Sequence, residues 1–174
     1  MKKGTRGFSL IELLIVVAII LIIAAIAIPN LLRSRIAANQ ASAVGSLRTL
    51  NTAEVTYSTT YNTGYSATLS DLGPPAASSP TPTSTAAGLI DEVLAGMSTP
   101  GGNATTAQTS QKSGYQFVYT PGATTGTAIT TYSITASPIS PGTTGTNYYF
   151  TDQSGVIRQN STTTASSTDS PLAG

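Results

Sequence analysis

Residues 7–29 read GFSLIELLIVVAIILIIAAIAIP, and this stretch decides the fold. From Leu13 to Ile28 it is apolar without interruption, and Glu12 is the only charged residue in it. A helix of roughly 20 apolar residues is long enough to cross the hydrocarbon core of a bilayer. The stretch therefore predicts one membrane-spanning helix near the N-terminus.

Basic residues flank this apolar stretch on both sides. Lys2, Lys3 and Arg6 precede it without an acidic neighbour, and Arg33 and Arg35 follow it. Cytoplasmic loops of membrane proteins carry the excess of Lys and Arg. We therefore expect a single-pass precursor in the inner membrane, with its N-terminus in the cytoplasm and the rest of the chain outside.

An ordinary secretory signal is the alternative interpretation of the same residues. Ala24, Ala25 and Ala27 are small residues of the kind that precede a signal cleavage site. The helical pattern, however, continues past Pro29 for about 30 residues, so that cleavage there would cut one continuous element. A helix that is kept in the mature protein is favoured.

Glu12 is a carboxylate at one end of an apolar helix, where an unpaired charge costs at least about 2.5 kcal/mol. In a lone span Glu12 would reach water at the interface or take up a proton. Alternatively it meets a cation that another subunit supplies. The nearest such cation is the new α-amine that cleavage after Gly7 would create.

The string GFSLIE, from Gly7 to Glu12, followed by an apolar helix resembles the class III signal of type IV pilins and of the pseudopilins of type II secretion. The resemblance implies that a prepilin peptidase cleaves between Gly7 and Phe8, and that Phe8 is then N-methylated. It implies that Glu12 serves assembly, and Pro29 matches the family's helix-kinking proline. The basic leader 1–7 would be lost.

The second half of the helix, residues 30–61, has one apolar face. An apolar residue recurs there at every seventh position: Ile36, Ala43, Leu50 and Tyr57. This spacing is typical of a helix that packs on a core along one side. We expect this half to be packed and the hydrophobic half, residues 8–29, to project.

The C-terminal part predicts a sheet. The candidate strands are rich in β-branched and aromatic residues and lie between turn sequences: 115–120, 129–135, 147–151 and 156–158. A four-stranded antiparallel sheet against the long helix is an α+β arrangement, and it resembles the pilin fold.

Proline and glycine interrupt the connection between helix and sheet, residues 62–114, in which we expect one short helix at 86–97 closed by Gly96. The polar tail, residues 159–174, is expected at the surface or partly disordered. The predicted organisation is a leader, a hydrophobic helix and one globular domain: 1–7, 8–29 and 30–174, the last with its sheet at 115–158.

The composition argues against catalysis and against a nucleic-acid site. The chain has no Cys and no His, only 9% charged residues and a net charge of +1. It therefore lacks thiolates, imidazole bases, the usual zinc ligands and a basic patch.

Asp91 and Glu92 are neighbours and point in different directions on a helix. Asp152 and Ser154 invite a calcium hypothesis, but calcium takes six to eight oxygen ligands and such residues in a tight turn are more often turn formers, so no cofactor or metal residue is assigned.

The resemblance implies a structural subunit of a type IV pilus, which serves adhesion, twitching motility or DNA uptake. Its implied partners are other copies of the chain in a helical filament, the prepilin peptidase, and an assembly platform and ATPase at the inner membrane. The mature subunit would be extracellular. A pseudopilin of type II secretion is the first alternative, and a single-span membrane protein with an unrelated soluble domain is the second.

Overall fold

The computed structural model describes residues 8–97 and 108–172. Gly7 and the rest of the segment 1–7, in which we predict the leader, lie outside the described residues. The chain divides into two compact units, Met1–Arg35 and Ile36–Gly174.

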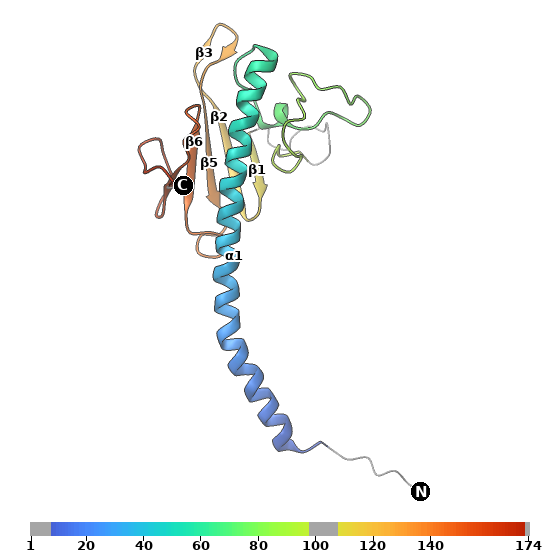
Figure 1. The fold of residues 1–174 in the computed structure, drawn as a ribbon, viewed down its shortest axis with the longest axis vertical. Coiled ribbons are helices and arrows are strands. Elements are labelled where there is room, and N and C mark those ends of the chain that lie inside the picture. The colour runs from blue at the N-terminus through green and yellow to red at the C-terminus, as the bar shows by residue number, and fades with distance from the viewer. Residues whose placement is uncertain (1–7, 98–107, 173–174) are drawn as a thin grey trace. The chain divides into compact units, whose positions relative to one another are not determined.

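One helix dominates the first unit and continues into the second. Helix α1 spans Leu10–Tyr61 and includes Pro29 (Figure 1). Proline removes one backbone hydrogen bond from a helix, yet α1 remains helical on both sides of Pro29. Within the first unit the side chains of α1 are exposed, with Ala24 alone half-buried.

The second unit is built on a five-stranded antiparallel sheet in the order β1-β2-β5-β6-β7. Its strands are Thr109–Lys112 (β1), Tyr115–Pro121 (β2), Tyr132–Pro138 (β5), Tyr148–Asp152 (β6) and Arg158–Asn160 (β7). A separate two-stranded ribbon joins β2 to β5, and its strands are Thr124–Thr125 (β3) and Ala128–Ile129 (β4).

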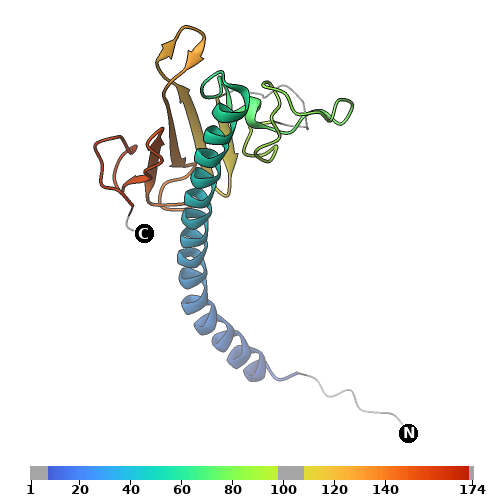
Figure 2. The ribbon, with the colours of Figure 1, turned by 45° about the horizontal axis from the view of Figure 1, so that its top comes forward.

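The part of α1 that belongs to this unit lies along the sheet, as the two ribbon views agree (Figure 1, Figure 2). Its buried residues come from one helix face, which includes Leu47, Leu50 and Tyr57. On the sheet side β2 and β5 alternate between buried and less buried residues. Phe117 and Ile134 are fully buried there. This is the α+β pilin fold that the sequence predicts.

The predicted number of strands was wrong by one. Strand β1 has the sequence TSQK, with no aromatic residue and only Ser110 buried. It pairs with β2 at the edge of the sheet. Because an edge strand is covered on one side only, its sequence lacks the apolar alternation that identifies an inner strand.

The predicted short helix at 86–97 was also wrong. The amides of Ala87 and Leu89 donate to the carbonyls of Asp71 and Leu72, at 2.8 Å each. These hydrogen bonds tie the first part of the segment to the 3₁₀-helix η1, Leu69–Leu72. The second part forms only a turn, in which the Ala95 amide donates to the Asp91 carbonyl at 3.0 Å. Tertiary partners therefore outweigh the helical pattern of the segment.

The ribbon β3–β4 is fixed to the turn after α1 at Gly64. The Tyr65 amide donates to the Ile129 carbonyl at 2.9 Å, and Gly64 forms a bridge to Ile129 with a φ of +78°. A Cβ at Gly64 would collide with the Ile129 backbone. Glycine alone adopts a positive φ without strain and has no Cβ that would meet the Ile129 backbone.

We expect Gly64→Ala to lower the free energy of unfolding by about 1–3 kcal/mol, since it adds strain and pushes the ribbon away. Chemical denaturation in detergent measures the change. Gly126→Ala is the matched control, because Gly126 has a φ of +64° and open space around its Cβ position. If both variants lost the same free energy of unfolding, the contact between Gly64 and Ile129 would contribute nothing to stability.

Candidate functional site

The N-terminal end of α1 carries an acidic residue that hydrogen-bonds to its own helix. The Ser9 amide donates to Glu12 Oε2 at 2.9 Å, and the Leu13 amide donates to the Ser9 carbonyl at 3.2 Å. The free amides of a first helical turn attract a carboxylate. Glu12 therefore caps the helix, and it remains exposed to a further partner.

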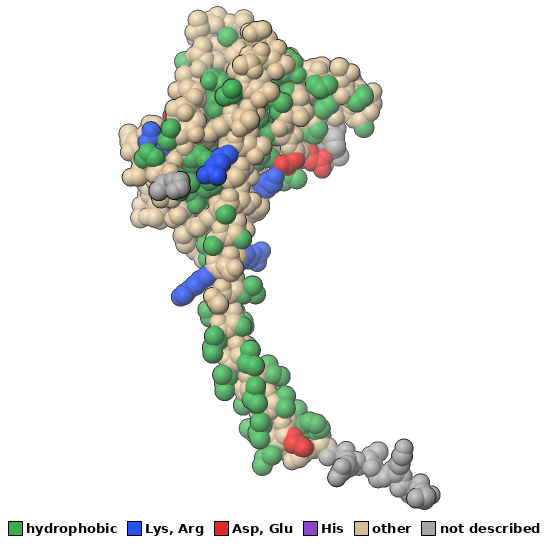
Figure 3. Space-filling model, viewed as in Figure 1, with side chains coloured by type: hydrophobic (Ala, Val, Ile, Leu, Met, Phe, Trp, Pro, Cys, Tyr) green, Lys and Arg blue, Asp and Glu red, His purple; other side chains and the backbone are tan. Residues whose placement is uncertain are grey.

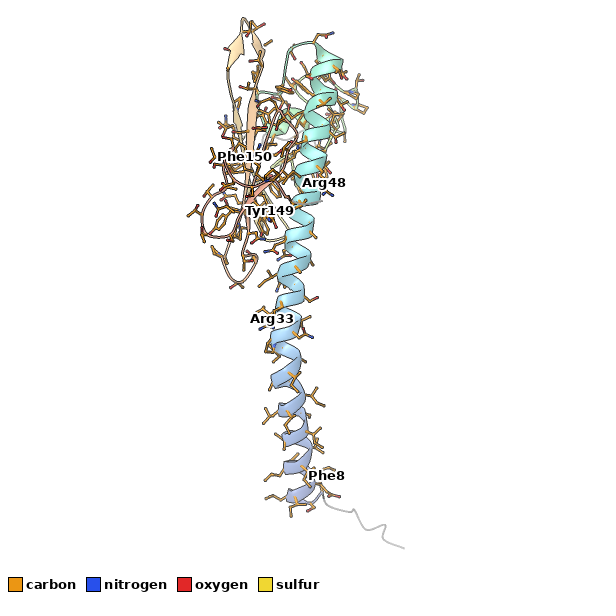
Figure 4. All side chains as sticks on the ribbon, turned by 60° about the vertical axis from the view of Figure 1, so that its left-hand side comes forward. Phe8, Arg33, Arg48, Tyr149 and Phe150 are labelled. Carbon is orange, nitrogen blue, oxygen red and sulfur yellow. The ribbon has the colours of Figure 1, made fainter. Side chains whose placement is uncertain are left out.

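The surface around this carboxylate is apolar. Phe8 is 75% exposed at the start of α1 (Figure 4), and large apolar side chains stay exposed along the helix to Leu31 and Leu32. Figure 3 shows the helix covered by hydrophobic side chains, with an acidic one at its end. An apolar surface of this extent marks a contact with protein or membrane.

Among residues 8–97 and 108–172, α1 is the one helix that is long and apolar enough to cross a membrane. A signal sequence would meet the same criterion. The length and composition of the helix are therefore compatible with a membrane anchor.

The structure brings Ser9 and Glu12 together and leaves Pro29 apart. Pro29 lies 17 residues after Glu12 in the same helix, about 25 Å away along the axis at 1.5 Å per residue. Phe8 is the first described residue, and Gly7 precedes the described part. Any role of Gly7, Phe8, Glu12 and Pro29 in processing or assembly remains a prediction.

Two other acidic residues named from the sequence, Asp91 and Asp152, have structural partners. Asp91 forms a salt bridge with Lys112 at 2.7 Å and accepts the Leu94 amide at 3.0 Å. Partial burial acts to raise its pKa, but these hydrogen bonds and the Lys112 charge lower it overall. Asp152 accepts the Ser154 amide at 2.9 Å, as turn-forming residues do. In the described parts of the chain no three acidic residues cluster as metal ligands.

The structure also shows a buried carboxyl that the sequence analysis missed. Glu54 is fully buried and accepts the Ser66 amide at 2.9 Å and the Ser66 hydroxyl at 2.6 Å. The Tyr119 hydroxyl donates to the Ser66 carbonyl at 2.7 Å. Position 54 follows Leu47 and Leu50 on the buried face of α1, and this spacing could have revealed it.

Burial raises the pKa of Glu54, although its hydrogen bonds to Ser66 act in the opposite direction. The folded state therefore binds a proton at the Glu54 carboxyl more tightly than the unfolded state does. The stabilisation that this proton gives is fully present below the ordinary Glu pKa, about 4.3. It is lost as the pH rises through the folded pKa. For every tenfold difference in proton affinity between the two states, we expect the unfolding free energy to decrease over that window by about 1.4 kcal/mol.

Denaturation curves between acid and neutral pH test this expectation. Glu54→Gln should remove the decrease, because the amide does not titrate. Glu92→Gln should leave it in place, because Glu92 lies outside the core cluster. An unchanged pH dependence in Glu54→Gln would contradict the assignment.

Comparison with known proteins identifies the segment around Glu12. A family model described as the prokaryotic N-terminal methylation motif matches residues 2–28. The type IV major pilin protein PilA of Myxococcus xanthus is 52% identical over 52 residues, which is 30% of this chain and 24% of that protein. The N-terminal segment of the chain therefore resembles that of type IV major pilins.

A second relative of this chain is the type IV wide pilus major component PilA4 of Thermus thermophilus. It is 62% identical over 37 residues, 21% of this chain and 28% of the relative. The chain thus spans only about a quarter of the length of each of these curated relatives. No solved structure matches it. The family resemblance predicted from the residues is confirmed.

Proposed function

We propose that this chain is the structural subunit of a type IV pilus and has no catalytic role. The observation that carries the proposal is the methylation motif at residues 2–28, together with the exposed apolar helix that follows it. Both relatives are named as major components of type IV pili. A helix with this exposed surface needs an apolar partner, which a membrane supplies before assembly and other subunits supply afterwards.

The proposed sequence of events begins at the membrane. The precursor lies in the inner membrane with its N-terminus in the cytoplasm, and a prepilin peptidase hydrolyses the peptide bond between Gly7 and Phe8. The Phe8 amine is then methylated. Loss of residues 1–7 removes three of the 8 basic side chains and leaves 5 against 7 acidic ones.

Assembly then uses residues 8–29 as the filament core, and residues 30–174 form the globular domain. The Glu12 carboxylate pairs with the Phe8 ammonium of a neighbouring subunit, which fixes the register of the two helices even if the net stability gain is small. Pro29 supplies a weak point at which the helix can bend. An assembly platform and an ATPase supply the work of extraction, and the finished filament serves adhesion, motility or DNA uptake.

Electron microscopy with gold-labelled antibodies against the globular domain tests the proposed function. A surface pilus predicts label along the whole length of extended fibres outside the cell. Label that is confined to the cell envelope, in cells without such fibres, would contradict it. That result would favour a pseudopilin or a single-span membrane protein.

A further inference from the structure

Two arginines follow the apolar part of α1 directly. Arg33 and Arg35 are exposed, and they come immediately after Leu31 and Leu32, which are also exposed. Neither arginine side chain forms a hydrogen bond or an ion pair with another residue that the structure describes. Their charges are thus available to a partner outside the chain.

The spacing of the charges along the helix matches the thickness of a bilayer. Arg33 lies 21 residues after Glu12 in one continuous helix, which corresponds to about 32 Å at 1.5 Å per residue. The hydrocarbon core of a typical bilayer is about 30 Å thick. When the Glu12 end lies at one boundary of this core, Arg33 lies at the opposite boundary.

The two arginines face different sides of the helix. Because successive residues of an α-helix are about 100° apart, positions 33 and 35 are separated by about 200°. Figure 3 shows basic side chains on both sides of α1 where its hydrophobic segment ends, and Figure 4 labels Arg33 there. A single protein partner would contact one side of the helix, whereas a layer of lipid headgroups surrounds it.

Within the headgroup layer, the guanidinium group of arginine is suited to bind lipid phosphates. Arginine binds phosphate through two parallel hydrogen bonds, and its long side chain can reach from the edge of the hydrocarbon to the headgroups. We propose that Arg33 and Arg35 form a phosphate-binding collar, which holds the precursor in the membrane by contacts with lipid phosphates on the side where its globular domain lies. The proposal rests on the membrane-anchored stage of the proposed function.

Arg48 provides an internal comparison. It is exposed on α1 but belongs to the second unit, 15 residues after Arg33 in the sequence. Arg48 does not border the apolar run, so a collar at the end of that run does not include it. A general attraction of arginine to an anionic surface would not distinguish the two positions, whereas a collar would.

The test measures the proximity of arginine to lipid phosphorus. The full-length precursor, with ¹³C at its guanidinium carbons and with Arg6→Gln in every sample so that segment 1–7 contributes no guanidinium, is placed in nanodiscs of phosphatidylcholine and phosphatidylglycerol in a buffer without phosphate. Solid-state NMR then records the dephasing of the guanidinium signal by ³¹P. We expect dephasing in the wild type, loss of most of it in Arg33→Gln/Arg35→Gln, and no loss in Arg48→Gln.

Two outcomes overturn the collar. One is a double variant that dephases as strongly as the wild type, and the other is a wild type without dephasing. Membrane insertion is checked separately with single cysteines, which is possible because the natural chain has none. If Ile20→Cys resists a water-soluble maleimide while dephasing is absent, the collar alone fails. If Ile20→Cys reacts readily, the membrane-anchored stage fails with it.

Discussion

Cells that produce the Glu12→Val variant are expected to cleave and methylate it but to form few or no filaments. The substitution leaves the apolar helix intact and removes the carboxylate that would pair with the Phe8 ammonium of a neighbour. Without that pair the ammonium enters the filament core unpaired, which costs several kcal/mol. Immunoblots of sheared and cell-bound fractions measure assembly, and intact mass measures processing.

Glu12→Gln is the control that separates charge from capping. The glutamine oxygen can still accept the Ser9 amide, which Glu12 accepts at 2.9 Å, but it cannot neutralise an ammonium group. Loss of a helix cap alone costs only about 0.5–2 kcal/mol. We therefore expect Glu12→Gln to assemble poorly as well. Abundant normal filaments from both variants would refute the pairing of Glu12 with Phe8.

Replacement of Gly7 by a large residue is expected to leave the leader attached to the whole population of the protein. The proposed cleavage requires a small residue before the scissile bond, and a bulky side chain would block its approach to the peptidase. A chain that keeps Lys2, Lys3 and Arg6 also keeps its cytoplasmic anchor, so filaments should be absent. Intact-mass analysis of the membrane fraction detects the retained segment.

Gly4 offers the matched control, because it lies in the same leader three residues upstream. The same large residue at position 4 should be processed as in the wild type, since position 4 is distant from the bond. A Gly7 variant that still loses residues 1–7 would show that the cleavage site is assigned wrongly.

The sequence alone was sufficient for the long helix and most of the sheet. The apolar run from Leu13 to Ile28 and the seven-residue spacing that follows are signals within one helix, and α1 covers both. Strands β2, β5 and β6 overlap the segments at 115–120, 129–135 and 147–151. Each of them carries β-branched or aromatic residues that pack on the buried face of the sheet.

The features that the sequence did not reveal depend on contacts between distant segments. Strand β1 exists because Thr109–Lys112 pairs with β2 at the sheet edge, and the segment after Ala86 is held by the backbone of Leu72. In the tail after Asn160, Ala165 is buried, and Asp169 accepts the side-chain amide of Asn160 at 2.9 Å. Such pairings leave no periodic pattern in the residues that form them.

Among the expected site residues, Glu12 was identifiable because a carboxylate in an apolar run is costly wherever the run is placed. Glu54 was harder to find, since its partner Ser66 lies 12 residues away in a turn. The buried pair becomes visible only when the turn after α1 folds back onto the helix.

Intact-mass and N-terminal analysis of protein sheared from the cell surface tests the central claim most directly. The account predicts a sheared chain that begins at methylated Phe8, which would establish processing, export and assembly together. A sheared fraction without this chain, together with cell-bound protein that still begins at Met1, would contradict the account.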